Sequence, residues 1–280
     1  MRKILVTGAG GFVGARILDQ WRGRYELCTF PHGFSADSDE AAVRALIARE
    51  KPDVIVHTAA LSNTAYCASH PEESLRANVL LPEWIAKAAA ETGAKLLAFS
   101  SDQVYAGCKR SGPLPETLSL APANVYGCHK LEAEQRVLAI TPGAILLRAA
   151  WMYDFPGYRL PIRGNLPLNL LSAAKIGTAL HFSEHDFRGV SYVREVIDKL
   201  IPAMELPGGV YNFGSGNDCD MFETVSRFAQ FLGVEVPLEK DHWERNLAMS
   251  GEKLKDFGIQ FDSTIQAFQQ CLDDYGFGHF

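Results

Sequence analysis

The chain has 280 residues and a formal net charge of −6 at pH 7. This acidic balance argues against nucleic acid or an anionic membrane as the main partner, so any anionic ligand must be held by local groups. No segment approaches the roughly 20 apolar residues of a membrane span, and a core strand follows Met1 without room for a signal peptide, so we expect a cytoplasmic protein. The six cysteines form no CxxC pair and no cluster with histidine at metal-ligand spacing, so we expect free thiols and no metal site.

Residues 3–14, with the sequence KILVTGAGGFVG, predict a strand, a glycine turn and a helix in immediate succession. Gly8 can adopt backbone angles closed to other residues, Gly11 lets the main chain approach a pyrophosphate, and Gly14 lets the helix lie close to the strand. Phosphates would then sit at the helix N-terminus, where free amides and the helix dipole favour negative charge. The segment predicts a dinucleotide site, with a purely structural turn as the alternative.

Apolar runs rich in β-branched residues alternate with helical patterns over the first 150 residues. The expected strands are 4–7, 26–30, 54–57, 96–100 and 145–148, and the expected helices lie near 12–21, 39–50, 72–91 and 124–139. The alternation predicts an α/β fold with a Rossmann-type, doubly wound parallel sheet. Residues 54–56 and 144–147 lack polar alternation, as expected of central strands covered on both faces.

The alternation of strands and helices ends near residue 153, where the chain becomes rich in proline and glycine. The expected elements beyond it are a helix over 191–204, a strand over 210–213 and a helix over 221–232. Asp220 and Glu223 have the spacing of a reciprocal helix cap at the start of the last helix.

The end of the strand–helix alternation predicts two lobes. We expect residues 1–153 to form an NAD(P)-binding Rossmann domain, with 181–205 packing back on it, and residues 154–280 to form mostly a smaller α/β substrate-binding lobe. A cleft between the lobes would be the natural place for a substrate.

A tyrosine four residues before a lysine places both side chains on one face of a helix. The ammonium can then lower the pKa of the phenol, so that the tyrosine exchanges protons near neutral pH. The spacing occurs twice, at Tyr105–Lys109 and at Tyr126–Lys130. Only the second pair follows a good helix cap, Asn124, and is predicted to be helical. Tyr105 is expected to be a packed aromatic residue and Lys109 a solvated charge.

Ser100 and Ser101 close the fourth expected strand. In an open parallel sheet, ligands gather at the carboxyl ends of the strands, so Ser101 is placed to bind a carbonyl oxygen. The alternative is that the two serines cap the following turn.

These motifs together resemble an extended short-chain dehydrogenase/reductase over most of the chain. Within that group the resemblance is nearest to the dTDP-4-dehydrorhamnose reductase family. The segments that carry it are Thr7-Gly8-x-x-Gly11-x-x-Gly14, Asp53–Ala60, Arg76–Val79, Ser100–Tyr105, Tyr126-x-x-x-Lys130 and Arg148–Tyr153, with looser echoes at 164–166 and 186–192.

The resemblance implies hydride transfer from NADPH or NADH to the 4-keto group of a nucleotide-activated deoxy sugar, as in dTDP-L-rhamnose biosynthesis. It implies that Tyr126 gives the proton, Ser101 polarises the carbonyl and Lys130 holds the nicotinamide ribose. It assigns cofactor contacts to Gly8, Gly11, Phe12, Val13, Gly14, Asp37, Ala59, Ala60, Asn78, Ser100, Tyr126 and Lys130, and substrate contacts to Asp102, Gln103 and Trp151. Homodimers are common in the family, although no residue here identifies an interface.

Several positions leave alternatives open. Asn78 would support Lys130, or it would be a buried asparagine bonded to backbone. Trp151 would stack on a sugar or base, or fill the space between the lobes. Asp37 would lie near adenine, or be a solvated loop charge. The second strand ends without an acidic residue, so the choice between NAD and NADP is open, with Arg24 and His32 as candidates for a 2′-phosphate contact.

Departures from related enzymes limit the reaction type. Sugar-nucleotide dehydratases carry a glutamate base where this chain has Gln103, which cannot remove a proton, so dehydration is disfavoured. Two alternatives to a reductase remain. One is an epimerase that uses the same serine, tyrosine and lysine with a tightly retained NAD, and the other is a non-catalytic NAD(P)-binding subunit like the regulatory subunit of methionine adenosyltransferase.

Overall fold

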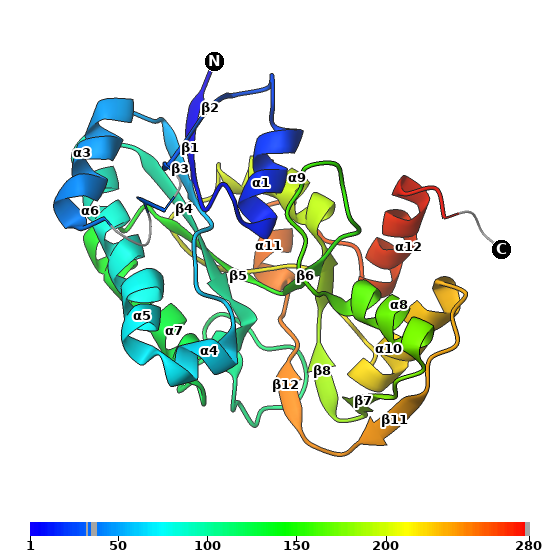
Figure 1. Ribbon diagram of the computed structural model, residues 1–280. Helices are drawn as coiled ribbons and strands as arrows, with labels where there is room; N and C mark the ends of the chain where they lie inside the picture. Colours follow the sequence, from blue (N-terminus) through cyan, green and yellow to red (C-terminus); the bar gives the residue numbers. More distant parts are fainter. Residues whose placement is uncertain (32, 35–37, 278–280) are drawn as a thin grey trace.

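The computed structural model describes residues 1–31, 33–34 and 38–277. Its centre is a six-stranded parallel sheet in the order β10-β5-β4-β3-β1-β2 (Figure 1). The strands are β1 (Lys3–Thr7), β2 (Glu26–Thr29), β3 (Val54–His57), β4 (Lys95–Ser101), β5 (Ile145–Ala149) and β10 (Gly209–Phe213). The predicted α/β class and its five N-terminal strands are confirmed. The strand order reverses between β1 and β3, which opens a crevice at their carboxyl ends.

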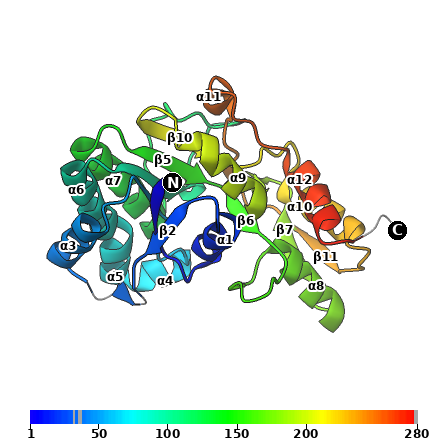
Figure 2. The ribbon, with the colours of Figure 1, turned by 90° about the horizontal axis from the view of Figure 1, so that it is seen from above.

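Helices cover both faces of this sheet (Figures 1 and 2). One face is covered by α3 (Glu40–Glu50), α6 (Leu81–Thr92) and α7 (Val125–Ile140), and the other by α1 (Phe12–Gln20) and α9 (Val193–Ala203). Successive strand residues supply the two cores: Ile4 and Val6 face α1 and α9, whereas Leu5 faces α3 and α6. Burial on both faces explains the continuous apolar runs of the sequence.

The helix expected over 72–91 is interrupted. A short helix α4 (Thr64–Ser69) is followed by α5 (Pro71–Leu75), a π-helical turn (Arg76–Leu80) and α6. π-Helical turns are rare and often mark functional sites. Asn78 lies in this turn and is buried.

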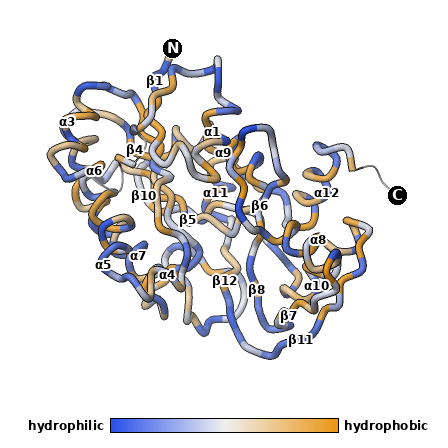
Figure 3. Tube along the Cα trace, in the orientation of Figure 1, coloured by the Kyte–Doolittle hydropathy of each residue, from blue (hydrophilic) through white to orange (hydrophobic). Residues whose placement is uncertain are grey.

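The smaller lobe is built from three parallel two-stranded ladders, β6–β9, β7–β11 and β8–β12, and from helices around them. Its strands are β6 (Trp151–Tyr153), β7 (Leu180–Ser183), β8 (Asp186–Arg188), β9 (Val190–Tyr192), β11 (Leu238–Asp241) and β12 (Arg245–Leu247), and its helices are α8 (Leu166–Ile176), α10 (Met221–Phe231) and α12 (Thr264–Asp274). Stacked rings of Phe228 and Phe268, 3.7 Å apart, join α10 to α12. The trace is apolar along the central strands and hydrophilic around β8, β11 and β12 (Figure 3).

The chain crosses back to the main sheet late in the sequence. After β9, α9 packs against α1, and β10 pairs in parallel with β5. The short helix α11 (Glu252–Lys255) then packs against β10. The exact division into domains stays a prediction. Among the described residues, no helix combines the length and the apolar character needed to cross a bilayer.

One predicted cap differs in detail. The Asp220 side chain accepts a hydrogen bond from the Glu223 amide, as expected, but the Glu223 carboxylate pairs with Arg227 instead of reaching back. The complete reciprocal box forms at α12, between Ser263 and Gln266. An i, i+4 arginine competes for the glutamate, and spacing alone does not reveal that competition.

Candidate active site

The glycine turn after β1 has the geometry that its sequence predicts. Gly8 has φ +69°, and its carbonyl accepts the Gly11 amide at 2.8 Å. A Cβ on Gly14 would lie 2.2 Å from the Gly8 carbonyl oxygen, so α1 can approach the turn this closely only with glycine there. Gly11 caps α1 without any side-chain hydrogen bond, which leaves the first amides of the helix available. This cradle fits a phosphate.

The loop after β3 is tied to the glycine turn. The Thr7 hydroxyl lies 2.7 Å from Nδ1 of His57 and receives the Thr58 amide at 3.2 Å. Ala59 is half-buried and Ala60 is exposed beside this contact. Phe12 is buried and Val13 half-buried at the start of α1. These four predicted cofactor contacts therefore flank the cradle or start its helix.

Three residues were candidates for contacts with the adenosine half of the cofactor, and the structure describes only one of them. Asp37 and His32 lie outside the described residues. Arg24 precedes β2, at the opposite end of the strand from the carboxyl ends where the glycine turn lies. The suggestion that Arg24 meets a 2′-phosphate is therefore wrong, because it depended on nearness in sequence.

Ser101, Tyr126 and Lys130 come together at the carboxyl end of β4. Ser101 ends the strand, and its hydroxyl donates to Asp102 and accepts from the Gln103 amide, both at 3.2 Å. Tyr126 lies in the first turn of α7, close enough to Ser101 for the two side chains to interact. Lys130, one turn further on, lies with Nζ 5.8 Å from the centre of the Tyr126 ring and donates to the Phe99 carbonyl at 2.8 Å. All three side chains are more than nine-tenths buried. The Asn124 side chain caps α7 as expected.

The charge states of this group differ from the expectation. Burial raises the pKa of Tyr126 above its ordinary value, and Asp102 adds to that rise, while the hydrogen bond from Ser101 opposes it. Burial lowers the pKa of Lys130 to about 8, against the attraction of Glu134. The expected depression of the tyrosine pKa by lysine was wrong for the structure as it stands, because desolvation dominates. Tyr126 is therefore a neutral phenol at neutral pH.

Two of the predicted cofactor residues are engaged within the protein. The Asn78 amide donates to the Leu61 carbonyl at 2.9 Å and accepts from the Leu61 amide at 3.1 Å. The Ser100 hydroxyl donates to Glu134 at 2.5 Å. Asn78, Ser100 and Lys130 nonetheless line one small cavity under α7. The backbone-bonded alternative for Asn78 is thus observed, while its cofactor role stays a prediction.

The predicted substrate residues meet an arginine that sequence reasoning left unassigned. Arg188, at the end of β8, pairs with the buried carboxylate of Asp102 at 2.5 Å. Its guanidinium lies 5.3 Å from the centre of the Trp151 ring. Gln103 donates to Asp102 at 3.5 Å and accepts from Asn124 at 3.1 Å. The ion pair connects the sheet to the smaller lobe beside Tyr126.

A second arginine, Arg163, was also missed. It reaches from the smaller-lobe side to donate to Ser62 at 2.8 Å, and its guanidinium lies 5.5 Å from the centre of the Phe12 ring. It is exposed, and it has no carboxylate within ion-pair distance among the residues that the structure describes. Phe12 begins α1 directly after the glycine turn, so Arg163 lies beside that turn. Nothing in the local sequence signals this position, because a loop brings it there.

Comparisons with known proteins agree with this geometry. The family model of the RmlD substrate binding domain matches residues 1–238. The spore coat polysaccharide biosynthesis protein SpsK of Bacillus subtilis is 24% identical over 85% of this chain and 82% of its own length. A dTDP-4-dehydrorhamnose reductase of Mycolicibacterium smegmatis is 35% identical over 54% of this chain and 46% of its own length. The methionine adenosyltransferase 2 subunit beta of Xenopus laevis is 37% identical over 54% and 47%.

The matched region covers about half the length of the last two relatives. Among solved structures, dTDP-4-dehydrorhamnose reductase from Bacillus anthracis in complex with NADP superposes with a TM-score of 0.86 over 98% of this chain and 99% of that one. At 20% identity, this likeness shows the shared fold.

Proposed function

The chain belongs to the RmlD substrate binding domain family, and from that membership we propose that it is an NAD(P)H-dependent reductase acting on the 4-keto group of a nucleotide-activated deoxy sugar. The observation that carries the proposal is the buried group of Ser101, Tyr126 and Lys130 at the carboxyl end of β4. The substrate would be a dTDP-4-keto-6-deoxy sugar or a close analogue.

The cradle of Gly8, Gly11 and Gly14 is proposed to hold the cofactor pyrophosphate at the N-terminus of α1. Lys130 would hold the nicotinamide ribose, and a bound reduced nicotinamide supplies a hydride. Under this proposal, residues 1–153 bind the cofactor, together with residues 181–205, which pack back on that domain. The rest of 154–280 mostly forms the substrate-binding lobe. NADP and NAD both remain candidates.

Tyr126 is placed to act as the proton donor. Reduction of a keto group leaves negative charge on the oxygen, and a neutral phenol beside Ser101 can donate to that oxygen as the charge develops. An epimerase would use the same three residues, so the assay must distinguish the two reactions.

Substrate recognition is proposed to use groups on both lobes. Trp151, with Arg188 over its ring, offers a flat face for a sugar or base. Asp102 accepts from Arg188 and would fix its orientation. Arg163 is exposed beside Phe12, and we propose that its guanidinium binds a diphosphate. The chain is acidic overall, so an anionic ligand needs a local cation of this kind.

A second candidate is a binding subunit without turnover. The identity to a methionine adenosyltransferase 2 subunit beta supports it, because that relative is as similar in sequence as the reductases. An intact catalytic group does not by itself distinguish the two functions.

The test is oxidation of NADPH and NADH, followed by absorbance, with dTDP-4-keto-6-deoxy sugars as substrates. Turnover by the native protein and its loss in Tyr126→Phe would establish the reductase. Nucleotide binding without turnover on any keto sugar tried would contradict it and favour the binding subunit. Purification with firmly bound NAD and interconversion of sugar epimers would favour the epimerase.

A further inference from the structure

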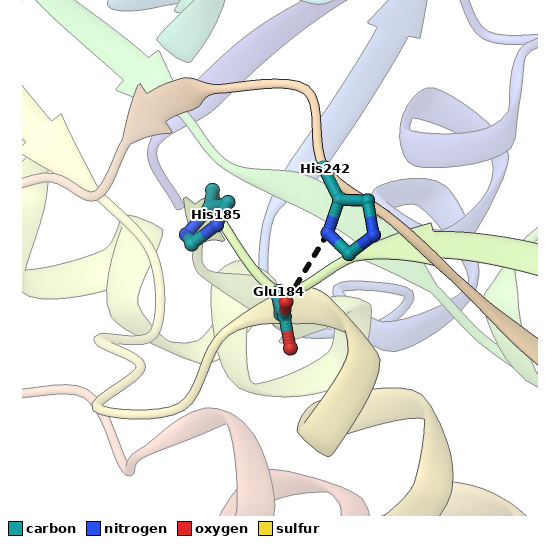
Figure 4. A group of neighbouring side chains, drawn as sticks. All are labelled: Glu184, His185 and His242. Carbon is teal, nitrogen blue, oxygen red and sulfur yellow. Dashed lines mark ion pairs between the residues drawn. The ribbon is translucent and has the colours of Figure 1, made fainter.

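Two histidines and a glutamate cluster in the smaller lobe (Figure 4). Glu184 and His185 form the turn between β7 and β8, and His242 follows β11. One ligand atom from each side chain can be chosen so that all lie within 4.8 Å of one another. In Figure 4 the glutamate lies between the two imidazoles.

Backbone hydrogen bonds hold the two segments in place. The Glu184 amide donates to the Asp241 carbonyl at 3.3 Å, and the Arg245 amide donates to the His185 carbonyl at 3.0 Å. The buried Ser183 hydroxyl donates to the Trp243 carbonyl at 2.5 Å and accepts the His185 amide at 3.0 Å. These contacts hold the backbone that carries the three side chains, so the ligand atoms converge from two fixed segments.

The carboxylate of Glu184 lies between a histidine and a lysine. One oxygen, Oε1, lies 3.2 Å from Nδ1 of His242, and the other accepts from Lys240 at 2.8 Å. Oε1 can thus serve as a ligand while Lys240 orients the group from behind, as partners outside the ligand set do in metal sites.

We propose that Glu184, His185 and His242 bind one divalent transition-metal ion of the Zn²⁺ type. Two imidazoles with one carboxylate suit zinc and its neighbours better than calcium or magnesium, which prefer oxygen ligands. Three protein ligands leave at least one position for water. The ion would join the β7–β8 turn to the segment after β11 and brace the β8–β12 ladder, whose β8 strand ends at Arg188.

The proposed site departs from the expectation of no metal ligands, which was drawn from cysteine and histidine spacing. Glu184 and His185 are separated from His242 by more than fifty residues, so no local motif announces the group. Parallel pairing of β7 with β11, in which Ser183 faces Asp241, is what brings them together.

The test is calorimetric titration of the tag-free native protein with Zn²⁺, together with its thermal unfolding. We expect one saturable site, and a rise in Tm with Zn²⁺ because the ion binds the folded state. His242→Ala and Glu184→Gln should each weaken binding at least tenfold. The matched control is His181→Ala, on the same ladder beside Glu239 and Asp241, which should bind as the native protein does.

Three results would overturn the proposal. They are no saturable binding up to about 100 μM Zn²⁺, native affinity in both His242→Ala and Glu184→Gln, or loss of the site in Cys128→Ser, which removes an exposed thiol. Visible absorption of the Co²⁺ form adds a check, since nitrogen and oxygen ligands give spectra unlike those of thiolates. The readouts do not involve turnover, so this outcome is independent of the proposed reductase.

Discussion

Two segments of this molecule share a Tyr-x-x-x-Lys spacing and a buried tyrosine, but differ in local structure and in the exposure of the lysine. Tyr126 and Lys130 lie one turn apart on α7, both buried beside Ser101. Tyr105 ends a 3₁₀ turn and is buried, while Lys109 is exposed in the loop beyond it. The spacing brings the two side chains to one face only where a single helix contains both the tyrosine and the lysine. Asn124 caps α7, so this helix contains Tyr126 and Lys130.

The second pair is nonetheless structurally important. The Tyr105 hydroxyl donates to Asn212 and accepts from Arg148, both at 2.8 Å. Arg148 also pairs with Glu134 on α7, at 2.7 Å. Tyr105 is thus part of a buried network that joins the sheet to α7, whereas Tyr126 is the proposed proton donor. We therefore expect substitutions at the two tyrosines to separate stability from turnover.

The largest expected effect is on turnover. Tyr126→Phe removes the proposed proton donor and should lower kcat for keto-sugar reduction by about 10²–10⁴-fold. Nucleotide binding should persist, because the glycine turn and Lys130 are untouched. Stopped-flow absorbance of NAD(P)H and a fluorescence binding titration measure the two. Near-native turnover in this variant would break the comparison between the two pairs.

Arg148→Met should produce the largest loss of stability. It leaves the Glu134 carboxylate, which is 4% exposed, without its cationic partner. Removing one member of a buried ion pair costs about 3–5 kcal/mol. Urea unfolding measures the change, and the exposed pair of Arg44 and Glu91 provides the control, where Arg44→Met should cost about 1 kcal/mol or less. Equal costs at both sites would contradict the network.

Lys130 should make stability depend on pH. Its pKa falls from 10.5 to about 8 on folding, so between these values the unfolded chain binds the proton that the folded chain releases. Stability should therefore rise with pH through this window, by roughly 3 kcal/mol in total. The free energy of unfolding of the nucleotide-free protein, compared with that of Lys130→Met from pH 7.5 to 10, isolates the effect. If the free energies of unfolding of the native protein and of Lys130→Met changed equally with pH, burial of the Lys130 ammonium would not destabilise the fold.

Tyr105→Phe should lower the stability of the protein and leave its turnover nearly unchanged. It removes one hydroxyl from buried partners, at a cost of about 1–3 kcal/mol. Its kcat should stay within about twofold of native, since the ring does not face the predicted substrate. Steady-state kinetics beside urea unfolding tests both halves. A kcat as low as that of Tyr126→Phe would reverse our assignment of the catalytic pair.

Lys109→Ala should have the smallest effect. The side chain is exposed and has no ion-pair partner within 4.0 Å among the described residues, so its removal should change stability by less than about 0.5 kcal/mol. A change in Tm beyond a degree or two, or a change in KM, would show that this lysine has a role that the structure does not display.

Local patterns predicted the sheet and the helical setting of Tyr126 and Lys130 well. Apolar runs gave β1 to β5 within one or two residues, because strands buried on both faces need continuous hydrophobic side chains. The glycine turn and the Asn124 cap are also local, since each depends on residues within four positions. Their backbone geometry follows from those residues themselves.

Contacts across the chain could not be predicted in this way. Arg188 meets Asp102 and Arg163 meets Ser62 across separations of 86 and 101 residues, and no periodicity encodes them. The pKa of Tyr126 was also misjudged, because burial by the surrounding lobes outweighs a lysine that the spacing alone placed nearby.

The late return of the chain to β10 has a consequence for synthesis. Until residue 213 leaves the ribosome, the outer edge of β5 keeps unpaired backbone groups, and Asn212 is absent from beside Tyr105. An open strand edge is a template for association with other chains. A product truncated near residue 153 would present that edge permanently and should aggregate, so the first half of this gene product needs the second half to cover it.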